Sequence, residues 1–348
     1  MADKKLKIGV IGASGYTGAD LVRLALRHPN ITIAALTANT HAGKQMGDVF
    51  AHLANQDLPD LVTNEEVDWN DIDAVICGLP HATSQKVISG LPEHLKIIDM
   101  SADFRLRDVE TYAQWYGNTH SAMDLQKIAV YGLTEHYREA LKSARLVACP
   151  GCYPTAALTL LLPVVGAEVI DATDLVIDAK SGVSGAGRSL KQNVLFCETG
   201  EGMSAYAVAS HRHAPEIEQE LSIAAKGDVL VNFTPHLVPM SRGEFLTVYA
   251  KLANGANAGD VRAVLEARYA DEPFVHVAKP GVAPGTQMVR GSNNVVLQVF
   301  EDRVPGRVIL MATLDNLVKG SAGQALQNFN VMYGLEETTG LDQVALFP

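Results

Sequence analysis

The chain has 348 residues, of which 47% are hydrophobic, and a formal net charge of −11. Its length exceeds what one ordinary hydrophobic core supports and predicts two domains, while its negative charge argues against nucleic acids and acidic membranes as partners. It has no apolar run of the roughly 18 residues that a membrane span needs, and residues 1–7 do not have the pattern of a signal peptide, so we expect a cytoplasmic protein.

The N-terminal segment has the pattern of a dinucleotide-binding loop. Residues 7–11 are an apolar run typical of a strand, residues 19–26 have helical spacing, and three glycines lie between them. Glycines let the backbone approach a pyrophosphate, and the start of the helix is electrostatically positive. A tight turn without a ligand is the simpler alternative. The predicted cofactor-binding residues of this loop are Gly12, Ser14, Gly15, Tyr16, Thr17 and Gly18.

The second predicted strand, residues 31–36, favours NADP over NAD. An NAD-binding fold usually has an acidic residue near the end of this strand, where it binds the ribose 2′-hydroxyl. Residues 37–44 contain hydroxyls, an amide and a lysine but no acid. Such a loop accepts a 2′-phosphate better, and Thr37 is its candidate contact.

Further strands are predicted at residues 73–79, 95–100, 130–133 and 144–149, which supports a mostly parallel α/β sheet. Cofactors lie at the carboxyl ends of such strands. The turn that begins at Pro80 is therefore a candidate cofactor contact. Arg105 follows the strand at 95–100 and is a candidate for binding an anion, although a surface salt bridge would explain it as well.

A cysteine stands where the next helix should begin. Pro150 and Gly151 force a turn after the strand at 144–149, and Pro154 suits the first turn of the helix that follows. Cys152 thus meets the free N–H groups of a helix start, which favour a thiolate and lower its pKa from roughly 8.5. The pattern predicts a cysteine nucleophile.

Cys149 and Cys152 form a C-x-x-C pair, which has other interpretations. A structural zinc site needs two more ligands at matching spacing, and Cys77 and Cys197 do not provide them. A thioredoxin-type redox pair also opens a helix after a strand and is a genuine local alternative. The third interpretation is that Cys149 is a buried strand residue and only Cys152 reacts.

Beyond residue 163 the pattern changes to a second, α+β domain. Several strands alternate apolar and polar residues, as in an antiparallel sheet with one covered face, and one amphipathic helix lies among them at residues 260–269. A last helix is expected at 317–332. The long loop predicted at 181–210 is of a length that is usually functional. The predicted strands cover residues 175–180, 229–233, 245–249, 295–300 and 307–311.

Two segments of this domain could assist the cysteine. Arg188 ends the glycine-rich segment 181–188 and can bind a carboxylate or phosphate as a fork. In the segment 211–217, His211 or His213 could exchange protons with a thiol, and Glu216 could orient a histidine or cap a helix. A metal site is the alternative for H-x-H, but no third ligand is close in sequence, so we expect none.

A nicotinamide cofactor and a cysteine nucleophile together define a reaction type. The thiolate attacks an activated acyl group or an aldehyde, hydride moves between the cofactor and the thioester or thiohemiacetal carbon, and a histidine moves the proton. The sequence therefore predicts an oxidoreductase.

Over nearly its whole length the chain resembles the N-acetyl-gamma-glutamyl-phosphate reductases of arginine biosynthesis, type 1. The segments P-G-C-Y-P-T and H-R-H-A-P-E-I are specific to this family, whereas the glycine loop is shared by many folds. Two departures are mild: the family often has an arginine after the second strand, and a glycine where this chain has Ala82. The segments that carry the resemblance are 12–18, 101–105, 150–155, 181–188, 211–217 and 315–320.

The resemblance implies the fold of glyceraldehyde-phosphate and aspartate-semialdehyde dehydrogenases: a Rossmann NADP-binding domain at 1–148, completed by a C-terminal helix at about 316–348, and an α+β catalytic and oligomerisation domain at 149–315. It implies NADPH-dependent reduction of N-acetyl-L-glutamyl 5-phosphate to the semialdehyde by a homo-dimer or homo-tetramer. Cys152 matches the nucleophile. His213 is preferred over His211 as acid/base, with Glu216 as its partner. The implied substrate-binding residues are Arg105, Ser181, Arg188 and Arg212, and the implied cofactor contacts in the second domain are Ser184, Gly185 and Asn316.

Three alternatives stay open. A related acyl-phosphate reductase could act on a longer or carrier-linked substrate of lysine biosynthesis, or on aspartyl phosphate, although aspartyl reductases lack P-G-C-Y-P-T. A thiol-disulfide redox protein could use Cys149 with Cys152. An NADP-binding sensor would need no chemistry at all.

Overall fold

The computed structural model describes residues 5–348. The prediction about a signal peptide concerned residues 1–7, of which residues 1–4 lie outside the described residues. The chain divides into two compact units. Unit 1 contains the N-terminal part up to Pro150 and the segment Ser321–Asp342. Unit 2 contains Gly151–Gly320 and the last six residues, Gln343–Pro348, which the prediction had placed in the first domain.

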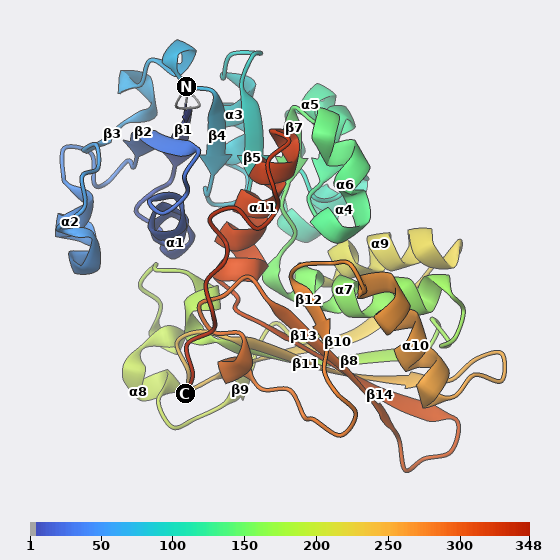
Figure 1. Ribbon diagram of the computed structural model, residues 1–348. Helices are drawn as coiled ribbons and strands as arrows, with labels where there is room; N and C mark the ends of the chain where they lie inside the picture. Colours follow the sequence, from blue (N-terminus) through green and yellow to red (C-terminus); the bar gives the residue numbers. More distant parts are fainter. Residues whose placement is uncertain (1–4) are drawn as a thin grey trace. The chain divides into compact units, whose positions relative to one another are not determined.

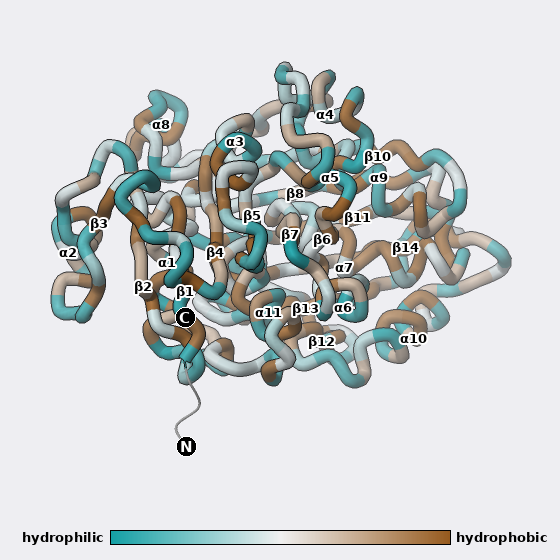
Figure 2. The backbone as a smooth tube through the Cα atoms, turned by 90° about the horizontal axis from the view of Figure 1, so that it is seen from above, coloured by the Kyte–Doolittle hydropathy of each residue, from teal (hydrophilic) through white to brown (hydrophobic). Residues whose placement is uncertain are grey.

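Unit 1 is built on a seven-stranded parallel sheet with the order β3-β2-β1-β4-β5-β7-β6. The order reverses between β1 and β4, which makes their carboxyl ends the switch point at which ligands bind in doubly wound folds. The strands are short and apolar, as buried parallel strands are, and Figure 2 colours β4 as hydrophobic. They are β1 Leu6–Ile11, β2 Ile31–Thr37, β3 Leu61–Val62, β4 Ala74–Cys77, β5 Lys96–Asp99, β6 Ala129–Tyr131 and β7 Leu146–Ala148.

Helices cover this sheet, including one from the end of the chain (Figure 1). α11 packs against β5 and α6, and it also contacts α1. An apolar cluster of buried residues packs Ile88 of α3, Phe104 and Ala122 against the strands of this sheet. The Rossmann architecture is thereby confirmed, and α11 belongs to the same unit as this sheet. The helices of unit 1 are α1 Tyr16–Ala25, α2 Met46–Val49, α3 Ser84–Ser89, α4 Val109–Tyr116, α5 Met123–Ile128, α6 Thr134–Ser143 and α11 Gly323–Met332.

Unit 2 is built on a second seven-stranded sheet, with the order β12-β13-β14-β11-β8-β10-β9. The expectation of an antiparallel sheet was incomplete, because β8 pairs with β10 and β12 with β13 in parallel. Its central strands alternate buried and half-buried residues, as a sheet with one covered face does. The strands are β8 Leu175–Gly182, β9 Ser204–Ala205, β10 Val231–Val238, β11 Glu244–Lys251, β12 Val275–Val277, β13 Val295–Glu301 and β14 Arg307–Leu314.

Helices α7, α9 and α10 lie on one side of this sheet (Figure 1). α7, Cys152–Gly166, contacts β11 and β14 and is almost entirely buried. α9, Ala214–Ala225, is the crossover between the parallel strands β8 and β10, and α10 spans Ala258–Tyr269. The segment predicted as one long loop, 181–210, instead begins within β8 and contains short helical turns, α8 Phe196–Thr199 and β9. A short π-helical turn, Val318–Ala322, precedes α11.

Candidate active site

Cys152 is the first residue of α7, as the proline and glycine pattern predicts. Gly151 is the N-cap, with an extended backbone and no side chain to cap the helix. The thiol is partly exposed, whereas Tyr153 and the residues that follow it are buried. Because the first N–H groups of a helix have no partner within it, they give this end a positive potential that stabilises a thiolate.

The turn before Cys152 is held by two residues of the α9 start. The backbone N–H of Gly151 donates to Oε1 of Glu216 over 2.9 Å, and Glu216 is only 1% exposed. A Cβ on Gly151 would lie 2.4 Å from Nε2 of His213. The His213 ring therefore packs directly against the cysteine turn, and only glycine leaves room for it. Pro215 lies in the first turn of α9, as predicted.

His211 belongs to an aromatic cluster beside the same turn. Its ring centroid is 4.7 Å from that of His213, 5.7 Å from Tyr153 and 5.4 Å from Tyr206. Its Nδ1 accepts the backbone N–H of His213 at 3.1 Å. Burial, assisted by the charge of Arg212, lowers the pKa of His211 to about 4. His211 is therefore neutral at pH 7.

Two residues absent from the sequence-based candidates also border Cys152. Glu244, the first residue of β11, is completely buried, and neither of its carboxyl oxygens has a hydrogen-bond partner among the described residues. Burial raises the pKa of Glu244 to about 8, while the nearby Cys152 side chain acts to lower it. Gly320 also packs against the cysteine, because a Cβ there would lie 2.8 Å from Cβ of Cys152. Neither had a sequence signal: a single acid at a strand start resembles a solvated residue, and Gly320 was noted only as part of a motif.

Four predicted ligand-binding residues of unit 2 come together near the end of β8. Asn316 donates from Nδ2 to Oγ of Ser184 over 2.9 Å, and its Oδ1 accepts the N–H of Gly243 at 2.8 Å. A Cβ on Gly185 would lie 3.0 Å from Oγ of Ser181. The strand register places Ser181 opposite Glu244. The glycine-rich segment is thus tied to the strand that carries Glu244.

The three candidate arginines differ in their surroundings. Arg188 and Arg212 are exposed in unit 2. Arg105, in unit 1, is only 8% exposed, and its guanidinium donates to the carbonyls of Cys149 and Met100 over 2.8 and 2.9 Å. These bonds join the chain after β5 to the chain after β7, which gives Arg105 a role in fixing those strand ends.

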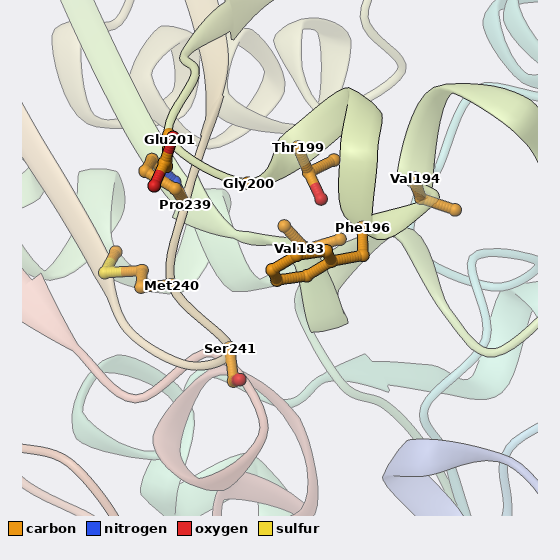
Figure 3. Close-up of a pocket in the computed structure, with 9 residues that line it drawn as sticks. All are labelled: Val183, Val194, Phe196, Thr199, Gly200, Glu201, Pro239, Met240 and Ser241. Carbon is orange, nitrogen blue, oxygen red and sulfur yellow. The ribbon is translucent and has the colours of Figure 1, made fainter.

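A pocket of about 460 Å³ opens beside the glycine-rich segment in unit 2 (Figure 3). The turn between β10 and β11 provides one wall, and the region of α8 provides another. The lining is mainly apolar, with a few polar side chains. Its residues are Val183, Val194, Phe196, Thr199, Gly200, Glu201, Pro239, Met240 and Ser241.

The glycine loop of unit 1 fits a dinucleotide. A Cβ on Gly12 would lie 2.4 Å from the carbonyl of Gly78, and one on Gly18 would lie 2.6 Å from the carbonyl of Gly12, so both positions are set by close backbone packing. At Gly15, the N-cap of α1, a Cβ would meet no atom closer than 3.6 Å. No side chain caps the helix there. The open space and free N–H groups suit a phosphate.

Two predicted cofactor contacts near this loop, Thr37 and Pro80, differ in their exposure. Thr37 is 2% exposed, and its hydroxyl already donates to Oδ1 of Asn64 over 2.6 Å. Pro80 is exposed at the carboxyl end of β4. Ala82 has φ 63°, a conformation that glycine adopts without strain. That conformation explains physically why the family often has glycine there.

Asp103, two residues before Arg105, is completely buried. It accepts hydrogen bonds from the Ala82 N–H, the Ser84 hydroxyl and the Tyr112 hydroxyl over 2.7 to 2.8 Å. Its carboxylate thus organises the loop between β4 and α3.

All four cysteines are free thiols. Cys149 is completely buried, and its sulfur accepts a hydrogen bond from Asn328 at 3.5 Å. Within residues 5–348, no group of three or more His, Cys, Asp and Glu side chains could hold a metal ion. In the same range, no helix is both long and apolar enough to cross a membrane.

Two family models match the chain. Residues 7–144 match the NAD-binding domain of semialdehyde dehydrogenases, and residues 152–316 match their dimerisation domain. An N-acetyl-gamma-glutamyl-phosphate reductase from Rhodospirillum rubrum is 55% identical over 99% of both chains. A probable chloroplastic N-acetyl-gamma-glutamyl-phosphate reductase from Arabidopsis thaliana is 52% identical, over 99% of this chain and 86% of its own.

Solved structures share the fold at low sequence identity. Aspartate semialdehyde dehydrogenase II from Vibrio cholerae, complexed with ASA, has a TM-score of 0.73 at 16% identity, over 95% of this chain and 99% of its own. The enzyme from Candida albicans with NADP has a TM-score of 0.68 at 16% identity, with the same coverage. These matches confirm the predicted fold class.

Proposed function

The chain belongs to the N-acetyl-gamma-glutamyl-phosphate reductase family, and on this premise we propose that it reduces N-acetyl-L-glutamyl 5-phosphate to N-acetyl-L-glutamate 5-semialdehyde and phosphate, in arginine biosynthesis, through a thioester on Cys152. The observation that carries the mechanism is the partly exposed thiol at the uncapped start of α7, with the His213 ring packed against the preceding turn. The names of the relatives do not favour the lysine-biosynthesis alternative.

Cys152 attacks the acyl carbon of the substrate, the C–O bond to phosphate breaks, and phosphate leaves with the electron pair of that bond. His213 takes the thiol proton before the attack and later returns a proton to the oxygen that becomes negative when hydride adds to the thioester carbon. The thiohemiacetal then loses that proton and collapses to the aldehyde, and the thiolate is restored. Glu216 holds the turn in place through the N–H of Gly151. His211, neutral at pH 7, shapes the aromatic wall.

Arg188 and Arg212 are the proposed partners of the substrate carboxylate and phosphate, because both are exposed and can offer a guanidinium fork. Ser181 is proposed to orient the acyl group, since it lies opposite Glu244 in the sheet. Arg105, which binds two backbone carbonyls, is proposed as a positioning residue for the chain before the cysteine turn.

NADP(H) is the proposed cofactor, and when bound it supplies the hydride. The family match supports a nicotinamide dinucleotide in unit 1, and the space at Gly15 suits the pyrophosphate. The absence of an acid after β2 supports the 2′-phosphate form. The Thr37 hydroxyl is engaged with Asn64, so Asn39, Thr40 and Lys44 are better placed to contact that phosphate. Asn316, Ser184 and Gly185 are proposed for the carboxamide end.

A homo-oligomer is proposed, with the face of the unit 2 sheet opposite α7 as the contact. The family model for this unit is described as a dimerisation domain. Phe245, Thr247 and Tyr249 alternate with fully buried residues along β11, and the register sets Met311 and Ile309 of β14 beside them. The cytoplasmic location expected from the sequence stays a prediction, and the Arabidopsis thaliana relative is named chloroplastic.

The test is a pair of single substitutions, Cys152→Ser and Cys149→Ser, assayed for phosphate-dependent reduction of NADP with N-acetylglutamate semialdehyde. We expect the first to abolish turnover and the second to retain it, because Cys149 is buried against Asn328. Equal loss in both variants, together with disulfide-exchange activity, would contradict the proposal. NADPH binding without hydride transfer to any of a panel of acyl phosphates would indicate a sensor instead.

A further inference from the structure

Two buried carboxyls of unit 1, which the reaction described above does not use, are joined by two serine hydroxyls. Asp99 ends β5, Asp103 follows it in the chain, and both are completely buried. Oδ2 of Asp99 lies 2.7 Å from Oγ of Ser101. That oxygen lies 2.7 Å from Oγ of Ser84, which lies 2.8 Å from Oδ2 of Asp103. Three short oxygen–oxygen contacts thus run from one carboxyl to the other.

The three contacts need one proton more than the two hydroxyls provide. Each serine has a single O–H to donate. If both carboxyls were ionised, two of these oxygens would face each other at 2.7 or 2.8 Å with no hydrogen between them, and two buried negative charges would repel each other. A proton on one carboxyl gives every short contact a donor. The remaining contact, 3.0 Å between Asp99 and Ser84, is longer and does not require one.

The other donors around the pair assign the negative charge to Asp103. Its carboxylate accepts the N–H groups of Ala82 and Gln85 over 2.7 and 3.3 Å. It also accepts the hydroxyl of Tyr112 over 2.7 Å, and this O–H points at Asp103 because Nε2 of Gln85 donates to the same oxygen at 3.0 Å. Asp99 receives fewer N–H donors among the described residues. Since hydrogen bonds to a carboxylate favour its charged form, the shared proton belongs on Asp99.

The burial of the pair determines when it holds this proton. Burial raises the pKa of Asp99 to about 6, and the charge of Asp103 acts in the same direction, against the hydrogen bonds from Ser101. The pair therefore takes up one proton as the pH falls from 8 to below 6. Below that range each short contact has a donor, and above it one contact has none.

The titratable and charged groups that face the pair come from all the neighbouring elements. Burial raises the pKa values of the Cys77 thiol and the Tyr112 hydroxyl and lowers that of His120, so these three are neutral at pH 7. The guanidinium of Arg105 is bound to backbone carbonyls after β5 and β7, and the Cys149 thiol accepts a hydrogen bond from α11. The proton in question is therefore the one on the carboxyl pair.

The loop between β4 and α3 is held by this chain of contacts. Ala82 has φ 63°, a strained conformation for alanine, and Asp103 binds its N–H. Ser84, the central hydroxyl, is the first residue of α3. The loop leaves β4 beside the proposed pyrophosphate site, because a Cβ on Gly12 would lie 2.4 Å from the carbonyl of Gly78. The firmness of the chain thus bears on a loop at the cofactor end of the sheet.

We propose that Asp99 and Asp103 share one proton through Ser101 and Ser84, and that this chain of hydrogen bonds holds the β4–α3 loop in the conformation that receives NADP(H). Asp103 is a positioning residue in this arrangement, since it acts on the loop and not on the cofactor. The inference rests on the proposed cofactor site in unit 1. When the pH rises, Asp99 loses its proton to the solvent, one hydrogen bond of the chain is lost, and the affinity for NADPH falls.

Two substitutions that make the same chemical change should have opposite effects. In Asp99→Asn the amide N–H can replace the carboxyl O–H as the donor to Ser101, so the chain stays complete at every pH. In Asp103→Asn an NH2 group stands where N–H groups and hydroxyls already converge, so donors face a donor and the loop is no longer held.

The experiment measures the NADPH affinity of the intact protein by fluorescence titration at pH 6 and pH 8. We expect Asp103→Asn to weaken binding about tenfold or more at both pH values, while kcat at saturating NADPH stays within about threefold of the wild type. Asp99→Asn should bind within about threefold of the wild type at pH 6. Between pH 6 and pH 8 the wild type should lose about three- to tenfold more affinity than Asp99→Asn, which is the effect of one hydrogen bond. Asp124→Asn, at an exposed carboxyl of unit 1, should match the wild type throughout.

Three results would overturn the inference: an Asp103→Asn protein that binds NADPH as tightly as the wild type, an Asp99→Asn protein as weak as Asp103→Asn at pH 6, or an equal pH dependence in Asp99→Asn and the wild type. If Asp103→Asn does not fold, Ser84→Ala takes its place. Without the central hydroxyl, the affinity at pH 6 should fall about threefold or more, and its pH dependence should match that of Asp99→Asn. Unchanged affinity in Ser84→Ala would again overturn the inference.

The shared proton is tested separately, without cofactor. The infrared difference between the wild type at pH 5 and at pH 8 should contain the C=O stretch of a protonated carboxyl that is missing from the same difference for Asp99→Asn. Identical spectra for the two proteins would overturn the inference. A wild type that shows this band but binds no NADPH, or that binds NADPH but reduces no acyl phosphate, would refute the proposed cofactor or reaction while the shared proton stands.

Discussion

Two helices of this protein begin after a glycine, and their first turns have opposite surroundings. At the start of α1, a Cβ on Gly15 would meet no atom closer than 3.6 Å. At the start of α7, a Cβ on Gly151 would lie 2.4 Å from the His213 ring, and the N–H of Gly151 is already bound to Glu216. Neither helix has a side-chain cap. The same positive helix end is thus open in one case and enclosed in the other.

The difference shows that the positive potential of a helix start can act on a bound ligand or on a residue of the helix itself. An open helix start leaves its N–H groups free for an anionic ligand such as a pyrophosphate. An enclosed start directs its potential at the first residue of its own helix, here Cys152, and the His213 ring and the Glu216 carboxyl lie against the turn before that residue. At Gly151 the packing of the His213 ring requires glycine, whereas at Gly15 we propose that glycine is needed for the approach of a ligand.

The largest effect should follow from closing the cysteine turn further. In Gly151→Ala the new methyl group would displace the His213 ring, so we expect kcat/KM to fall by at least about 100-fold, the usual range for losing a positioned acid or base. Thermal unfolding should change far less. Gly166→Ala, in the last turn of the same helix where a Cβ meets nothing within 4 Å, is the matched control and should be active. Equal activity of the two variants would show that His213 does not need its place against the turn.

The next effect separates the glycines of the open loop. Gly15→Ala should leave the free energy of unfolding nearly unchanged but weaken NADPH binding by about tenfold or more, because the methyl group would occupy the space proposed for the pyrophosphate. Gly18→Ala should destabilise the fold by about 1 to 3 kcal/mol, since its Cβ would meet the Gly12 carbonyl at 2.6 Å. Fluorescence titration and urea unfolding measure the two quantities. Unaltered NADPH binding by Gly15→Ala would mean that this helix start is not the phosphate site.

The sequence predicts both helix starts because glycine and proline are local signals. Residues 12–18 and 150–155 each carry their turn residues between an apolar strand and a helical run, and no distant contact is needed to recognise them. Glu244 could not be found in this way. Its burial depends on the sheet order β14-β11-β8 and on the packing of α7 against β11, which join segments far apart in the sequence.

The burial and the contacts of a charged residue could not be predicted from the sequence either. Arg105 and Arg188 both follow strands and both looked like anion binders, yet the first is buried against backbone carbonyls and the second is exposed. The mixed character of the unit 2 sheet was missed for a similar reason. Residues 211–217 predicted only a helix start, whereas the full helix α9 forms the crossover that parallel pairing of β8 and β10 requires.

The smallest effect concerns the stability cost of the enclosed turn. The folded protein keeps His211 neutral down to a pKa of about 4, whereas the unfolded chain binds a proton near pH 6.5. The stability linked to His211 is therefore fully present above pH 6.5 and is lost as the pH falls from 6.5 towards 4. The open glycine loop contains no histidine and has no such cost.

Urea unfolding of the wild type and His211→Asn at pH 7 and pH 5 measures this cost. Between these pH values the wild type should lose about 1 to 2 kcal/mol more than the variant. Other buried groups with shifted pKa values, such as His28, His120 and Asp99, are common to both proteins and cancel in the difference. His276→Asn, at an exposed histidine, should behave like the wild type. An identical pH dependence in His211→Asn and the wild type would show that the ring takes up its proton freely in the folded state, and the cysteine turn would then be less enclosed than its packing indicates.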